Sequence, residues 1–193
     1  MKALLDNGHG NNTPGKRSPD RSIYEWEYCR RVVSELERRL KAAGIDVVRI
    51  VKEDNDVSLY ERCRRVNTIA RKEPCVLDSI HLNAAGGDGK WHDARGFLPF
   101  VSLNASAKSK HFAQILYDEA EQRNIKGNRW MGKERYKVKD LAMCRETICP
   151  AVLTENLFQD NREDVAFLLS DEGFNTVVDL HFAAIKRYIE TYG

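Results

Sequence analysis

Two histidines directly follow short, mostly apolar runs, where an imidazole is well placed to bind a metal ion. His9 comes after Ala3–Leu5 and lies between two glycines, and His81 comes after Val76–Ile80. Runs this short predict buried strands that lead into loops. One such histidine is usually structural, but the carboxyl ends of parallel strands share the edge of a sheet where ligands bind. We therefore expect His9 and His81 to reach the same ion.

Two glutamates are candidates for the third ligand. A catalytic zinc site usually has three protein ligands, often two histidines and one carboxylate, and leaves the fourth position to water. Glu25 and Glu27 begin the helix that is predicted after the His9 loop, and a side chain in its first turn can fold back toward the strand ends. We expect Glu25 to be the ligand. Glu27 is the alternative, and either carboxylate would also complement the helix dipole without binding a metal.

Glu155 is the candidate catalytic acid/base. It closes the apolar run Pro150–Leu153 and is followed by further apolar residues, so we expect a charged group at the end of a buried strand. A carboxylate beside a zinc-bound water can take the water's proton and pass it to a leaving amine. The structural alternative is an ion-paired glutamate at the strand end.

Alternating strands and helices must position these residues. The stripe Val32, Leu36 and Leu40, ended by Gly44, predicts a long amphipathic helix. The predicted helices are Glu25–Ala43, about Ser58–Arg71, about Ser106–Arg123 and Glu172–Tyr192, and the predicted strands are the two that lead into the histidines together with Ile45–Val51, Phe97–Val101 and Pro150–Glu155. This order predicts a three-layer α/β fold with a largely parallel sheet, and the 193 residues without an internal linker predict a single domain, 1–193.

Composition excludes several classes of protein. The 31 basic and 29 acidic residues give a net charge of +2, which does not favour a nucleic-acid partner. The chain starts without a signal-peptide pattern and has no apolar run of membrane length, so we expect the product to be cytoplasmic as synthesised. The five cysteines lack Cys-x-x-Cys spacing, which argues against a disulfide framework and a thiolate zinc site. Nothing in the composition indicates an oligomeric state.

Three segments resemble motifs of one enzyme family, the zinc-dependent N-acetylmuramoyl-L-alanine amidases of the amidase_3 type, found as cell-wall autolysins and phage endolysins. Asp6–Gly10 resembles the family's Asp-Pro-Gly-His-Gly, with Asn7 in place of proline. Ser79–Ala84 is similar to Ser-Ile-His-x-Asn-Ala. Pro150–Asn161 is similar to Pro-Ala-Val-Leu-x-Glu-x-Gly-Phe-x-x-Asn, with Leu157 in place of glycine. The likeness spans most of the chain.

The resemblance implies a fold and a metal site. The fold would be a mixed, mostly parallel six-stranded sheet between helices, of the phosphorylase/hydrolase-like kind. Zn²⁺ would be held by His9, Glu25 and His81, and Glu155 would be the catalytic acid/base. The reaction would be hydrolysis of the amide between N-acetylmuramic acid and the first L-alanine of the stem peptide, with peptidoglycan or muropeptides as substrate.

The resemblance also implies substrate contacts and leaves rival functions open. Asn83 and Arg145 match family positions near the cleft and are expected to bind substrate. A related zinc exopeptidase would instead need a cation for a free substrate carboxylate, for which Arg145 or Arg62 would serve. A non-catalytic wall-binding module is the other alternative. Without a recognised signal, release as a phage or prophage lysin would bring the protein to the wall, and the alternatives are export by an unrecognised path and a cytoplasmic role on recycled muropeptides.

A few further side chains carry weaker expectations. Asp78, where the family usually has an apolar or small residue, is expected either to orient a metal-bound histidine or to bind an arginine. His92 is a candidate for the rim of the site, and His111 and His181 are expected to be structural. A groove for sugar and peptide, or else an ordinary surface loop, is predicted from five residues: Arg129, Trp130, Lys133, Tyr136 and Lys137.

Overall fold

The computed structural model describes residues 1–193 except 126 and 130. Within this part of the chain, six strands form one mixed sheet in the order β2-β1-β3-β6-β4-β5. They are β1 (Lys2–Asn7), β2 (Val47–Arg49), β3 (Cys75–Asn83), β4 (Phe97–Val101), β5 (Lys137–Val138) and β6 (Ala151–Phe158). Neighbouring strands are parallel except for β4 and β6, which are antiparallel. The predicted fold class is confirmed.

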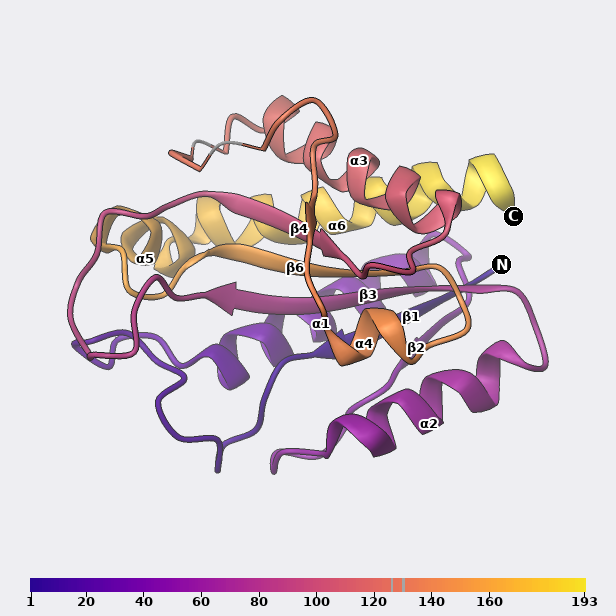
Figure 1. Ribbon diagram of the computed structural model, residues 1–193, viewed down its shortest axis with the longest axis horizontal. Helices are drawn as coiled ribbons and strands as arrows, with labels where there is room; N and C mark the ends of the chain where they lie inside the picture. Colours follow the sequence, from indigo (N-terminus) through magenta and orange to yellow (C-terminus); the bar gives the residue numbers. More distant parts are fainter. Residues whose placement is uncertain (126, 130) are drawn as a thin grey trace.

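Helices cover both faces of the sheet. They are α1 (Glu25–Ala42), α2 (Leu59–Ala70), α3 (Ala107–Gln122), α4 (Ala142–Arg145), α5 (Arg162–Leu169) and α6 (Asp171–Tyr192). In Figure 1, α3 lies above the sheet and α2 lies below it, and α6 passes behind β4. The larger apolar core joins α1, α3, α5 and α6 to one face, and a smaller core joins α2 and α4 to the other. No helix among the described residues has the length and apolar content to cross a membrane.

The strand pattern explains why the sheet is buried on both sides. Successive side chains of a strand point to opposite faces, and in β1 both Leu4 and Leu5 are fully buried, Leu4 in the core with α2 and Leu5 in the core with α1. On α1, Leu36 and Leu40 are also fully buried. A central parallel strand therefore has an almost continuous apolar sequence. A polar residue within such a strand is costly to bury unless it has a hydrogen-bonding partner or a function.

Two strands extend further than predicted. β3 continues past His81 to Asn83, and β6 continues past Glu155 to Phe158, so neither candidate site residue ends its strand. The prediction of a strand end at Glu155 was wrong because the following residues are buried and stay paired with β4, with Phe97 opposite Asn156. The carboxylate therefore projects from the middle of a paired strand, whose backbone holds it firmly.

Three short elements were not predicted: β5, α4 and α5. With two, four and eight residues, they are too short to show a clear hydrophobic period. For α5 a local signal existed, since the Asn161 side chain accepts hydrogen bonds from the amides of Glu163 and Asp164 at 3.1 Å. This is the N-cap contact that asparagine commonly makes. The second predicted strand was also too long, because β2 spans only Val47–Arg49.

Asp78 neither orients a metal-bound histidine nor binds an arginine, and both expectations are corrected. Its Oδ2 lies 2.6 Å from His181 Nδ1, and His181 Nε2 lies 2.8 Å from Asn156 Oδ1, all three residues being at most 1% exposed. His81 comes three positions after Asp78 in β3, an odd offset, so their side chains point to opposite faces of the sheet. Asp78 thus belongs to a polar cluster beneath α6, in which His181 has a structural place.

Candidate metal centre

His9, Glu25 and His81 converge at the carboxyl edge of β1 and β3. Glu25 Oε1 lies 3.3 Å from His9 Nε2 and 3.1 Å from His81 Nδ1, and one potential ligand atom from each residue lies within 4.8 Å of the other two. The two imidazole rings are perpendicular, with centroids 5.2 Å apart. Two imidazoles and one carboxylate at this spacing can hold a single divalent cation.

Glu25, and not Glu27, joins the histidines. Glu25 is 1% exposed in the first turn of α1, whereas Glu27 is exposed to solvent. The carboxylate of Glu25 also accepts hydrogen bonds from Leu82 N at 3.1 Å and from Gln159 Nε2 at 3.2 Å. Burial acts to raise the pKa of Glu25, but the adjacent histidines outweigh it and hold this pKa well below its usual range. Glu25 is therefore a buried anion held in a fixed position between two imidazoles.

Arg62 supports the backbone that carries His9. It is 2% exposed, and its guanidinium donates to Asp6 Oδ1 at 2.7 Å, to Asn7 O at 2.6 Å, to His9 O at 3.2 Å and to Asp56 Oδ1 at 2.9 Å. His9 has a φ of 58°, a strained conformation for a residue with a Cβ, and these bonds help to hold it. Arg62 is thus not available to a substrate carboxylate, so its suggested exopeptidase role is wrong.

Gly8 lets the histidine loop approach β3. A Cβ on Gly8 would lie 2.4 Å from His81 Nδ1, far inside contact distance. Gly8 N also donates to Ile80 O at 2.9 Å, which continues the pairing of β1 with β3 up to the site. The glycine before His9 is therefore required by the close approach to His81.

Glu155 lies beside the His9–Glu25–His81 group. It is directly opposite His81 in the parallel pairing of β3 with β6, so the two side chains point to the same face. Burial raises the pKa of Glu155 to about 7, and the positive charge of His81 acts in the opposite direction. Its Oε2 is buried and has no hydrogen-bond partner among the described residues. Glu155 therefore lies within its strand and forms no ion pair among the described residues, and its Oε2 is free to accept a hydrogen bond from another group.

A cleft of about 720 Å³ opens next to the site, and we call it the cationic cleft. Asn83, two residues beyond His81, lies in its wall. Its lining residues are Asn83, Ala84, Ala85, Ala94, Leu98, Phe100, Asn128, Arg129, Lys137, Val138, Lys139 and Phe158. A second groove of about 420 Å³ meets it at Ala84 and is lined by Gly15, Arg17, Ser18, Pro19, Arg21, Ala84, Gly86, Gly87, Asp88, Gly89, Lys90 and Asp160.

Arg145 is not a lining residue of either depression. Its guanidinium forms ion pairs with Asp140 and with Glu146, the latter at 2.7 Å, and it lies at the end of α4. Asn83 therefore lines the cleft, whereas the Arg145 side chain is held in ion pairs outside it. A substrate role for Arg145 remains a prediction that would require both ion pairs to open.

The other side chains singled out in the sequence are scattered. His92 Nε2 lies 2.9 Å from Asp88 Oδ1 in the loop that borders the second groove. His111 Nδ1 lies 2.7 Å from Tyr192 Oη, a contact between α3 and α6. Tyr136 donates to Glu134 at 3.3 Å. Of the predicted sugar and peptide groove, Arg129 and Lys137 line the cationic cleft, and Trp130 lies outside the described residues.

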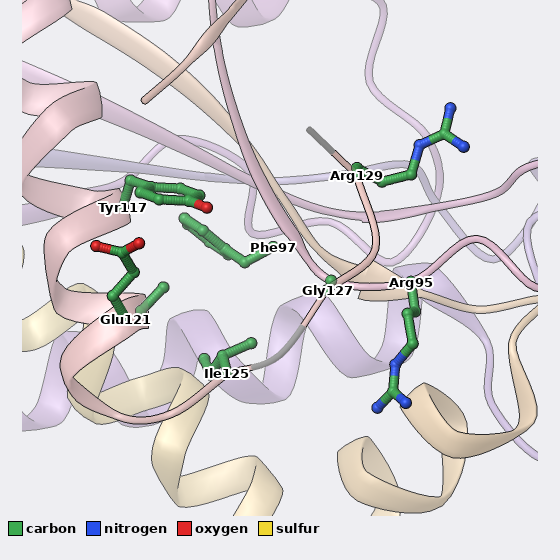
Figure 2. A pocket seen from close by; sticks show the side chains of 9 residues that line it. Arg95, Phe97, Tyr117, Glu121, Ile125, Gly127 and Arg129 are labelled. Atoms are coloured by element: carbon green, nitrogen blue, oxygen red, sulfur yellow. The ribbon is translucent and has the colours of Figure 1, made fainter. Parts of the chain in front are cut away.

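A small cavity of about 40 Å³ lies apart from the metal ligands, behind β4. Figure 2 shows Phe97 and Tyr117 packed together in its wall, and the Arg129 side chain turned away from both. Its volume suits only a few water molecules. This cavity is part of the packing between β4 and α3 rather than a substrate site.

Gln159 is the residue of the site that the sequence did not indicate. It is 1% exposed, and its side-chain amide donates to the Glu25 carboxylate. It follows β6 at a point where no spacing rule predicts contact with the first helix. Glutamine has no charge to signal a buried functional position, so only the folded chain shows this contact.

Comparison with known proteins identifies relatives over most of the chain. The family model Amidase_3, described as N-acetylmuramoyl-L-alanine amidase, matches residues 3–187. The endolysin of Bacillus phage SPP1 is 32% identical over 188 residues, which make up 96% of this chain and 65% of that protein. The amidase CwlM of Bacillus licheniformis is 26% identical over 97% of this chain and 68% of its own length. The chain therefore spans about two thirds of these relatives.

Solved structures share the fold. The N-acetylmuramoyl-L-alanine amidase from Clostridium difficile 630 matches with a TM-score of 0.85 at 22% identity, covering 100% of this chain and 98% of the other. The catalytic domain of CwlV from Bacillus (Paenibacillus) polymyxa matches with a TM-score of 0.83 at 22% identity, covering 98% of each. The family resemblance seen in the three motifs is confirmed. The chain belongs to the N-acetylmuramoyl-L-alanine amidase family, Amidase_3.

Proposed function

We propose that this chain is a zinc-dependent N-acetylmuramoyl-L-alanine amidase that cleaves the amide between muramic acid and L-alanine in peptidoglycan or muropeptides. The observation that carries the proposal is the group His9, Glu25 and His81 with the unpartnered carboxylate of Glu155 beside it. Family membership supports the reaction, and the phage endolysin among the relatives supports the cell wall as its target. The family match over 3–187 supports one catalytic domain.

The donor set fits zinc. His9, Glu25 and His81 would hold the ion, which supplies a lowered pKa for a bound water and polarisation of the scissile carbonyl. Glu155 accepts the proton of the attacking water and returns it to the alanine nitrogen as the C–N bond breaks. Gln159 and the amide of Leu82 keep the Glu25 carboxylate oriented, as groups behind a metal ligand commonly do.

Product analysis tests the reaction. On purified sacculi we expect new free amino groups on L-alanine and intact glycan strands, loss of activity after chelation, and recovery on adding zinc. Trimming of free peptide ends would instead establish the exopeptidase. Wall binding without any product would establish the binding module. Recovery with another divalent metal but not with zinc would overturn the choice of metal and leave the reaction standing.

Gly8→Ala is expected to weaken metal binding. The added Cβ cannot fit 2.4 Å from His81 Nδ1, so the imidazole or the loop must shift and a ligand is displaced. We expect zinc affinity to fall roughly 10- to 100-fold, as for other disturbances of ligand orientation, measured by competition with a chromogenic chelator. Gly87→Ala is the matched control, because a Cβ there meets nothing within 4 Å. Equal affinities in the two variants would contradict this account of Gly8.

A further inference from the structure

The cationic cleft has charge of one sign only. Its lining includes Arg129, Lys137 and Lys139 and no aspartate or glutamate among the described residues. Lys139 Nζ lies 5.8 Å from the centroid of the Phe100 ring. Neither Lys139 nor Arg129 forms an ion pair with the described part of the chain, although the protein carries almost as many acidic as basic residues. Unpaired cations gathered in one cleft indicate an anionic ligand.

The cleft leads directly away from the reacting centre. Asn83 in its wall is two residues beyond His81, and Leu98 in its floor is the residue opposite Glu155 in the pairing of β4 with β6. Leu98, Phe100 and Phe158 provide an apolar floor for small aliphatic side chains. Figure 2 shows that the Arg129 side chain turns away from the small cavity it also borders. A chain bound across the scissile bond would therefore extend into this cleft.

The second groove has a different character. It contains Asp88 and Asp160 together with Arg17, Arg21 and Lys90, and much of its wall is glycine. Asp160 is 5% exposed, and its Oδ1 has no hydrogen-bond partner among the described residues. Asp88 and Asp160 offset two of the three positive charges of this groove, and an acceptor such as Asp160 Oδ1 suits hydroxyl or amide donors. Of the two depressions that meet at Ala84, the cationic cleft is the one suited to an acidic chain.

We propose that the cationic cleft binds the peptide half of the substrate through its free carboxylates, with Lys139 and Arg129 as the pairing cations. The inference rests on the proposed amidase function and adds a specificity to it. Muropeptides whose side-chain and terminal carboxyl groups are free are preferred over muropeptides in which those groups are amidated. The neutral, hydroxyl-rich sugar half lies toward the second groove.

Paired substrates test the preference. Two soluble muropeptides are compared that differ only in whether the α-carboxyl of the second residue, a γ-linked glutamate, is free or a carboxamide. We expect the wild-type KM to be roughly fivefold higher for the amide with little change in kcat, because ion pairs with exposed cations contribute up to about 1 kcal/mol. The preference should shrink at high salt, as screening predicts. Equal KM values for both substrates would overturn the proposal, while cleavage of both would leave the amidase function standing.

Variants assign the effect to the cleft. Lys139→Met and Arg129→Met should each raise KM for the free-acid substrate and reduce its advantage over the amide. Lys110→Met is the matched control, since Lys110 is an exposed lysine of α3 that does not line the cleft, and it should keep the wild-type preference. Because Lys139 also acts on the charge of Glu155, Arg129→Met is the cleaner variant. A full preference retained in both cleft variants would refute the assignment.

Discussion

Glu155→Gln is expected to abolish wall hydrolysis and to leave metal binding and folding intact. The amide has almost the same shape as the carboxylate but cannot take a proton from water, and general acid–base catalysis typically contributes 10²- to 10⁴-fold to rate. We therefore expect kcat to fall by about that factor with one zinc still bound per chain. Activity on a soluble muropeptide, zinc stoichiometry after dialysis and a thermal unfolding curve measure the three quantities.

The position of Glu155 makes this expectation specific. It lies opposite His81 across the β3–β6 pair, and its Oε2 has no partner among the described residues. Burial raises the pKa of Glu155 to about 7, because a buried carboxylate loses the hydration that stabilises its charged form. A glutamate at this position therefore does not stabilise the fold through its charge. If the role were structural, substitution by the neutral amide would leave activity unchanged.

A second variant separates chemistry from packing. Glu155→Ala removes the carboxyl group altogether, so it should lose activity to the same extent even if it unfolds at a somewhat lower temperature. Loss of zinc in either variant would instead make Glu155 a metal-site residue. Wild-type activity in either would remove it from the mechanism.

Much of the fold could be predicted because long elements carry a clear period. The buried stripe of α1 and the short apolar runs of β1 and β3 are visible in the sequence, and they suffice to bring His9 and His81 to one edge of a parallel sheet. The shorter β5 and α4 have no such period. Strand ends were also misplaced, because a polar residue such as Glu155 interrupts an apolar run without ending the strand.

The contacts behind the ligands could not be predicted, since they join residues far apart in the chain. Arg62 looks like a surface residue of an amphipathic helix, yet it is buried against Asp6 and the backbone of the His9 loop. The alternation along β3 puts Asp78 on the face opposite His81, but its partner His181 comes from α6, about 100 residues further along the chain. Strand and helix patterns predict which face a residue takes, but not its distant partner.

Replacing Glu25 by glutamine tests the metal centre itself, and Glu27→Gln is its matched control. Both glutamates lie in the first turn of α1 and both changes remove one negative charge there, so any effect through the helix dipole is similar. Only Glu25 is buried against the two histidines. We expect Glu25→Gln to weaken zinc binding by at least about 100-fold and to lose activity in proportion, because an anionic ligand is lost.

Glu27→Gln should bind zinc and cleave substrate as the wild type does, with its free energy of unfolding changed by no more than about 0.5 kcal/mol, as for other exposed sites. Glutamine at position 25 keeps a carbonyl oxygen to accept from Leu82 N and so avoids most of the penalty of about 1–3 kcal/mol for an unpaired buried donor. A folded Glu25→Gln protein without tightly bound zinc is therefore the expected result, and excess zinc should restore part of its activity. Unchanged zinc affinity in Glu25→Gln, or a loss in Glu27→Gln, would show that the cation is held by a different set of residues.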